Sequence, residues 1–180
     1  MAFLYHSKFT NAPLPPPNSL KGQHILVTGA NSGLGLEASL HCLNLGANQV
    51  IITTRSASKG DEARRYLEAN TTGLGHVKVM HLEMGTFAGV KDFVDRLKKE
   101  ESVIDLVLLN AGVQNFPGYP ATVSKDGWEN TLQVNTLSTL LLGVLLLPWM
   151  KVAGRGKAHM GFTGSGSGFS IHIPSCLQIN

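Results

Sequence analysis

The segment that decides the fold is His24-Ile25-Leu26-Val27, followed at once by Thr28-Gly29-Ala30-Asn31-Ser32-Gly33-Leu34-Gly35. An apolar run that meets a glycine-rich turn and then a helical composition predicts a strand, a tight bend and a helix. The first backbone N–H groups of such a helix are free and its dipole is positive there, so a pyrophosphate can bind. Glycines also mark ordinary turns, and the interpretation therefore depends on the rest of the chain.

Strands and helices alternate along the chain after this segment. Strands are predicted at 25–28, 49–54, 77–82, 103–109 and 159–163, and helices at 33–45, 61–70, 87–97 and from a capping box of Asp126 and Glu129 to about Met150. This order predicts an α/β fold, a doubly wound parallel sheet of the Rossmann type with right-handed crossovers. We expect one domain at 21–169, a proline-rich lead at 1–20 and an irregular tail at 170–180.

The composition excludes several classes of function. A net charge of +3 without a dense basic stripe argues against nucleic-acid binding. Cys42 and Cys176 form no disulfide or metal pattern and the histidines are scattered, so we expect no metal and a reducing compartment, the cytoplasm. The apolar run 137–150 is shorter than the roughly 20 residues of a membrane span, which favours a buried helix and leaves an interfacial contact open.

A guanidinium follows the second predicted strand, at the edge where open α/β sheets bind their ligands. Arg55 stands where a site selective for NAD usually has an acid, and no Asp or Glu lies between Val50 and Gly60. A guanidinium suits a 2′-phosphate, and Lys59 supplies a second cation, so the pattern favours NADP over NAD. The alternative interpretation of Arg55 is an exposed loop residue.

Two further strand ends carry candidate cofactor contacts. Glu83 follows the third predicted strand, where its carboxylate could accept a hydrogen bond from an adenine amino group. Asn110-Ala111-Gly112 follows the fourth, where small residues let the backbone lie against a bound ring and ribose. As an isolated turn this tripeptide would be unremarkable, and its place in the order of strands gives it value.

The chain resembles the short-chain dehydrogenase/reductases over about residues 21–169. The resemblance lies in the glycine turn, Leu109-Asn-Ala-Gly112, Val134-Asn135 and Thr163-Gly164-Ser165, and Arg55-Ser56 is similar to the NADP-preferring, retinol-dehydrogenase-like branch. It implies an oxidoreductase that transfers a hydride between NADP(H) and an alcohol or carbonyl, here a small lipophilic molecule or secondary metabolite. The cofactor contacts that it implies are Gly29, Ser32, Gly33, Leu34, Gly35, Arg55, Lys59, Glu83, Asn110, Ala111 and Gly112. The family usually has Asp where this chain has Glu83, which displaces the charge.

The same resemblance implies a catalytic set of Asn, Ser, Tyr and Lys. Asn135 matches the Asn that holds a water, and Ser165 matches the Ser that holds the substrate oxygen, with Ser167 a weaker candidate. The Tyr-x-x-x-Lys element is absent, because Tyr5, Tyr66 and Tyr119 are followed four residues later by Phe9, Asn70 and Val123. We therefore expect a chain truncated after about the fifth strand, with weak or absent cofactor binding and no activity alone. The run 164–168 could also be a flexible loop.

Two other functions remain open from the sequence. The first is a non-catalytic dinucleotide-binding or interaction module, which forms a homo- or hetero-oligomer through the apolar helix 128–150, as the family does at its subunit interfaces. The second is a methyltransferase with a nucleotide-binding fold, which also has a glycine turn after its first strand. Such an enzyme would normally have an acid at the end of the second strand, where Arg55 stands.

Overall fold

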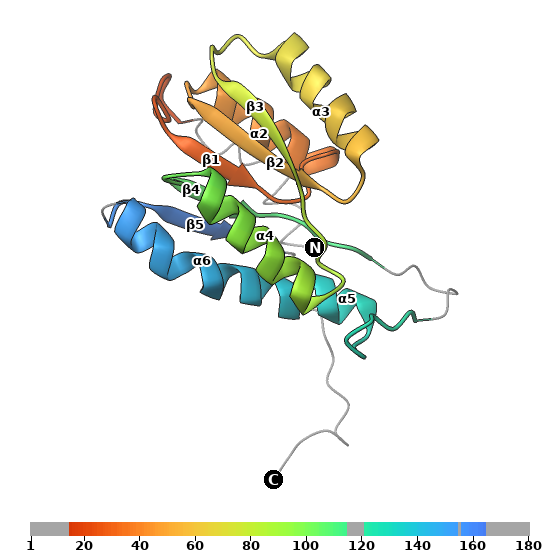
Figure 1. Ribbon diagram of the computed structural model, residues 1–180. Helices are drawn as coiled ribbons and strands as arrows, with labels where there is room; N and C mark the ends of the chain where they lie inside the picture. The colour runs from red at the N-terminus through yellow and green to blue at the C-terminus, as the bar shows by residue number, and fades with distance from the viewer. Residues whose placement is uncertain (1–14, 115–120, 155, 165–180) are drawn as a thin grey trace, which may run out of the picture.

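A parallel five-stranded sheet forms the centre of the computed structural model, which describes residues 15–114, 121–154 and 156–164 (Figure 1). The strands are β1 (His24–Val27), β2 (Gln49–Thr54), β3 (His76–His81), β4 (Leu106–Leu109) and β5 (His159–Phe162), in the spatial order β3-β2-β1-β4-β5. The helical segments are α2 (Gly33–Asn44), α3 (Ala57–Asn70), α4 (Phe87–Glu100), α5 (Asn130–Leu132), a π-helical turn η1 (Gln133–Ser138) and α6 (Thr139–Ala153). The doubly wound fold predicted from the sequence is confirmed.

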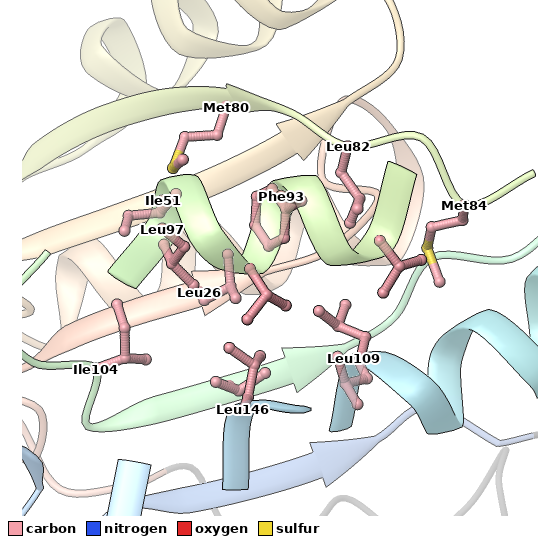
Figure 2. Packing of buried hydrophobic residues seen from close by; sticks show 14 of the residues in the cluster. Leu26, Ile51, Met80, Leu82, Met84, Phe93, Leu97, Ile104, Leu109 and Leu146 are labelled. Atoms are coloured by element: carbon pink, nitrogen blue, oxygen red, sulfur yellow. The ribbon is translucent and has the colours of Figure 1, made fainter. Parts of the chain in front are cut away.

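Helices cover both faces of the sheet, and each face has its own apolar cluster. α2 and α3 pack with Ile25, Val27, Val50 and Ile52 on one face. On the other face, Phe93 and Leu97 of α4 and Leu146 of α6 lie among Leu26 and Ile51 of the strands (Figure 2). The central strands are therefore apolar on both faces, as parallel strands between two layers of helices must be.

Two elements begin several residues away from their predicted starts. α3 begins at Ala57 rather than at Asp61, because the Ser56 side chain accepts a hydrogen bond from the Lys59 N–H and caps the helix. β4 begins at Leu106 rather than at Val103. These shifts leave the order of the elements unchanged.

The predicted capping box of Asp126 and Glu129 does not form. Asp126 Oδ2 accepts a hydrogen bond from the Phe87 N–H at 2.6 Å, at the start of α4. Glu129 is itself the N-cap of α5 and accepts from the Leu132 N–H at 2.9 Å. Backbone hydrogen bonds from Thr131 and Leu132 hold the pKa of the Glu129 carboxyl below its usual value. The helix therefore starts at Asn130.

The long helix extends further than the apolar run that predicted it. It continues from Asn130 to Ala153, 24 residues, and by length and composition alone it could cross a membrane. The predicted length of the apolar run, residues 137–150, thus understates the length of the helix. Its residues Leu142, Leu146 and Met150 are nevertheless buried against the sheet and α4, as in the core helix of a globular domain. Leu140, Val144 and Leu147 are exposed apolar side chains on the same helix.

Candidate functional site

A cavity of about 420 Å³ lies at the carboxyl edge of the sheet. Its walls come from the β1–α2 turn, the end of β2, the loop after β3 and the turn after β4, together with Val134 of η1. The chain runs from β1 outward through β2 to β3 and then returns to place β4 on the other side of β1. The cavity therefore sits where the strand order reverses, the position at which open α/β sheets bind ligands.

The glycine turn is packed so tightly against the β4 turn that side chains do not fit. Gly29 has a φ of +64°, and a Cβ there would lie 2.7 Å from Ala111 Cα. A Cβ on Gly35 would lie 2.5 Å from Asn110 Nδ2 and 2.7 Å from the Gly29 carbonyl oxygen. Such approaches are shorter than van der Waals contact, so both glycines are needed for the first turn of α2 to sit beside β4. Gly33 begins α2 in the same turn.

Side chains from neighbouring strands brace this turn. The Thr28 hydroxyl accepts hydrogen bonds from the Asn110 and Ala111 N–H groups at 2.9 and 3.0 Å. The Asn110 amide donates to the carbonyl oxygens of Thr28 and Gly29 at 3.1 and 3.3 Å, and its oxygen accepts from the Thr163 hydroxyl at 3.3 Å. Asn110 thus ties together the ends of β1, β4 and β5. Because the Asn110 side chain is fully used in these hydrogen bonds, a ligand in the cavity would meet the backbone of this turn instead.

Arg55 lines the same cavity as the glycine turn. It follows β2 directly and is exposed. Within the described parts of the chain its guanidinium makes no hydrogen bond or ion pair, so it is available to an anion. Lys59 is not among the lining residues and lies, exposed, in the first turn of α3.

The loop after β3 forms the opposite wall. Leu82, Glu83, Met84 and Gly85 all line the cavity. Glu83 Oε1 accepts a hydrogen bond from the Gly85 N–H at 2.6 Å, so one carboxylate oxygen is turned onto its own loop. An adenine amino group would have to meet the other oxygen.

Asn135 lies in η1 and grips the backbone after β4. Its Oδ1 accepts from the Val113 N–H at 2.8 Å, and its Nδ2 donates to the Val113 carbonyl oxygen at 2.8 Å. This pairing fixes the segment that follows Gly112, next to the cavity. Ser165 and Ser167 lie outside the described residues.

The structure thus brings eight of the eleven predicted cofactor residues to one cavity. They are Gly29, Ser32, Leu34, Arg55, Glu83, Asn110, Ala111 and Gly112. The sequence reasoning missed Asn31, Thr53, Thr54 and Val134, which also line it. Thr53 and Thr54 end β2, and their place at a strand's carboxyl end was an available signal. Thr28 belongs to the glycine-turn segment quoted first, but its hydrogen bonds to the β4 turn could not be predicted without knowing the register of β1 against β4.

A glycine turn at the crossover point of a parallel sheet with helices on both faces defines a Rossmann-like α/β protein. Residues 23–173 match the family model described as short chain dehydrogenase. The chain therefore belongs to the short-chain dehydrogenase/reductase family, whose members bind NAD(P) and act on small molecules. This membership confirms the resemblance at the level of the family.

Relatives and solved structures agree with this assignment. The chain is 40% identical over 154 residues to the short-chain dehydrogenase/reductase ffsI of Aspergillus flavipes, with 85% of this chain and 44% of the relative covered. It is 36% identical over 174 residues to dmxR8 of Cryptosporiopsis sp., with 96% and 52% covered. The chain thus spans about half the length of these relatives.

Two solved structures share the fold. A short chain dehydrogenase from Shigella flexneri superposes with a TM-score of 0.69 at 24% identity, covering 87% of this chain and 60% of that one. The RhlG/NADP active-site complex of Pseudomonas aeruginosa superposes with a TM-score of 0.63 at 26% identity, covering 78% and 52%.

Proposed function

We propose that the cavity binds NADP(H) and that the chain is part of an oxidoreductase that transfers a hydride between NADP(H) and an alcohol or carbonyl. The observation that carries the proposal is the position of Arg55, which lines the same cavity as the glycine turn and has no protein partner among the described residues. A pyrophosphate at the start of α2 and a 2′-phosphate on Arg55 would then be held by one dinucleotide. The similar RhlG structure, which holds NADP, supports this choice.

The residues around the cavity have separate tasks in this proposal. The backbone of the turn from Gly29 to Gly35 receives the pyrophosphate, and Ser32 and Leu34 flank it. Ala111 and Gly112 leave room for the ribose and ring, and Glu83 meets the adenine with its second oxygen. Asn135 orders the backbone at Val113, and Ser165 would hold the substrate oxygen. Lys59 contributes at most long-range charge.

We further propose that the 180 residues by themselves bind the cofactor weakly and do not turn over substrate. Their sequence contains no Tyr-x-x-x-Lys element to transfer the substrate proton and to lower the pKa of the transferring phenol. A non-catalytic dinucleotide-binding or interaction module is the alternative that this observation favours. NADPH oxidation by the purified chain with small lipophilic ketones would contradict both the expected inactivity and this alternative.

Two further features fit the same proposal. Among the described residues Cys42 has a free thiol, which accords with the proposed reducing compartment, the cytoplasm, and burial raises its pKa to about 11, which keeps it protonated. The exposed side chains of Leu140, Val144 and Leu147 support an oligomer formed through the helix 128–150.

The experiment compares NADP⁺ and NAD⁺ binding by titration calorimetry. We expect tighter binding of NADP⁺, and we expect Arg55→Ala to weaken NADP⁺ by about tenfold or more, because a charge-assisted hydrogen bond contributes about 1.5–3 kcal/mol. The affinity for NAD⁺, which has no 2′-phosphate, should change far less in this variant. Arg65→Ala is the matched control, since Arg65 is an exposed arginine of α3 away from the cavity. Equal affinity for the two dinucleotides, unchanged by Arg55→Ala, would contradict the assignment of NADP.

A further inference from the structure

The π-helical turn η1 joins two buried polar side chains that an α-helix would keep apart. Residues five positions apart in an α-helix point about 140° away from each other, at about 100° per residue. In η1 the hydrogen bonds run from i to i+5, and Gln133 and Ser138 face the same side. Gln133 Nε2 donates to Ser138 Oγ at 2.9 Å, and both side chains are fully buried.

This pair continues into a chain of hydrogen bonds that ends on the cavity wall. The Ser138 hydroxyl donates to the Met84 carbonyl oxygen at 2.7 Å. At the other end, the Ser124 hydroxyl donates to Gln133 Oε1 at 3.3 Å, and Ser124 Oγ accepts from the Trp128 N–H at 3.2 Å. Every hydroxyl in the chain therefore both donates and accepts. The inner part of this chain, Gln133 and Ser138, is buried, and a buried pair whose hydrogen bonds are all satisfied holds its groups rigidly.

The group held at the inner end, the Met84 carbonyl, belongs to the loop after β3, which forms one wall of the cavity. Met84 lies in the loop 82–85, whose four residues line the cavity, and Figure 2 shows its side chain reaching toward the core beside the end of that loop. Met84 is buried, and its neighbour Glu83 bonds to Gly85 within the same loop. The Ser138 hydroxyl thus holds the loop through a buried hydrogen bond to the Met84 carbonyl oxygen.

The same turn holds a second wall of the cavity. Asn135, between Gln133 and Ser138, grips the Val113 backbone through two hydrogen bonds of 2.8 Å. Val134 of the turn lines the cavity directly. One irregular turn therefore contacts both the loop after β3 and the segment after β4. A standard α-helix would turn Gln133 and Ser138 away from each other, so this double contact depends on the π-helical turn.

We propose that Gln133 and Ser138 are positioning residues, which set the loop 82–85 for the adenosine half of the dinucleotide through the Met84 carbonyl. The proposal rests on the proposed function, since it assigns part of the same site. It predicts that loss of the Ser138 hydroxyl leaves the fold intact, frees the loop and weakens binding of the adenosine half.

The experiment uses the 180-residue chain and its Ser138→Ala variant, with adenosine 2′,5′-bisphosphate as the probe. We expect the variant to bind the probe about five- to tenfold more weakly, as the loss of one buried hydrogen bond implies. Hydrogen exchange should rise at the amides of residues 83–85. Thr139→Val is the matched control, because the Thr139 hydroxyl is also buried but donates to the Val134 carbonyl oxygen of η1 at 2.9 Å rather than to the loop 82–85.

The outcomes separate the two proposals. A wild-type chain that binds neither NADP⁺ nor the probe overturns the proposed function. A wild-type chain that binds, with Ser138→Ala and Thr139→Val equal in affinity and in exchange at 83–85, overturns the role of the network. If Ser138→Ala does not fold, Ser124→Ala tests the outer end of the chain of hydrogen bonds. A smaller weakening of probe binding is then expected, and unchanged binding would overturn the proposal.

Discussion

Polar groups at the two ends of the sheet have different surroundings: those at one end line a cavity, and those at the other pair with one another. At the carboxyl end, the guanidinium of Arg55 and the backbone of the glycine turn face a cavity. At the amino end, charged groups pair with one another: Lys78 Nζ lies 2.6 Å from Glu101 Oε1 and 3.0 Å from Glu100 Oε2, and Gln49 Nε2 donates to Glu101 Oε1 at 3.1 Å. One sheet thus separates groups that line a cavity from groups that pair with one another, and substitutions at the two ends should have separable effects.

The largest effect is expected at the carboxyl end, from Gly29→Ala. The new Cβ would lie 2.7 Å from Ala111 Cα, so the β1 and β4 turns must move apart. Overpacking of this kind costs about 1–3 kcal/mol, and we expect NADP⁺ binding to fall by up to about 100-fold in calorimetric titrations.

The control for this change is Gly22→Ala. Gly22 also has a positive φ, +78°, but nothing lies within 4 Å of its Cβ position. The left-handed backbone costs both variants about 1–2 kcal/mol of stability, whereas the clash belongs to Gly29 alone. Similar NADP⁺ affinity in the two variants would show that the close contact at Gly29 does not matter for binding.

A smaller effect, confined to stability, is expected at the amino end from Glu101→Gln. The Glu101 side chain is 7% exposed, and its loss of charge leaves Lys78 with the more exposed Glu100. We expect the free energy of unfolding in urea to fall by about 1–2 kcal/mol, because a mostly buried ion pair is broken while a hydrogen bond remains.

Cofactor affinity should stay within about twofold in this variant, since Glu101 lies at the other end of the sheet. Glu100→Gln is the control and should change stability by about 0.5 kcal/mol or less, because its carboxylate is exposed. A drop in NADP⁺ affinity that accompanies Glu101→Gln would show that the two ends are coupled.

The smallest expected effect is a pH dependence of the same ion pair. Burial acts to lower the pKa of Lys78, but hydrogen bonds and charges from Glu101 and Glu100 outweigh it, and the pKa lies above its ordinary value of 10.5. A raised pKa means that the stabilisation is fully present below pH 10.5 and is lost as the pH rises through the folded-state value. The stability difference between wild type and Glu101→Gln should therefore shrink in urea titrations above pH 10.5. A constant difference over that range would assign the effect to packing.

The order of strands and helices and the place of the cavity could be predicted because their signals are local. Ile25 to Val27 and Val50 to Ile52 are apolar runs, and the glycines after β1 mark the turn without reference to any distant residue. The carboxyl ends of parallel strands lie at one edge by geometry, so sequence order alone was enough to place Arg55 and Ala111 near the glycine turn.

The missed features depend on contacts between distant residues. Asp126 was expected to cap its own helix, but its carboxylate caps Phe87, 39 residues earlier in the chain. Lys59 was expected to supply a second cation near Arg55, whereas the Ser56 cap begins α3 early and puts Lys59 in the first turn of the helix. The π-helical turn leaves no periodic signal, because a single wider turn shifts the apolar pattern by one position only.

That single wider turn also decides which part of the molecule a change of chain length would affect. A π-helical turn takes up one extra residue, so deleting one residue between Gln133 and Ser138 with a return to standard α-helical winding would leave α6 in phase with α5. Leu142, Leu146 and Met150 would keep their place against the sheet, and the change would fall on Val134 and Asn135, which contact the cavity and Val113. The extra residue of this helix therefore shapes the cavity wall, and its loss would spare the core.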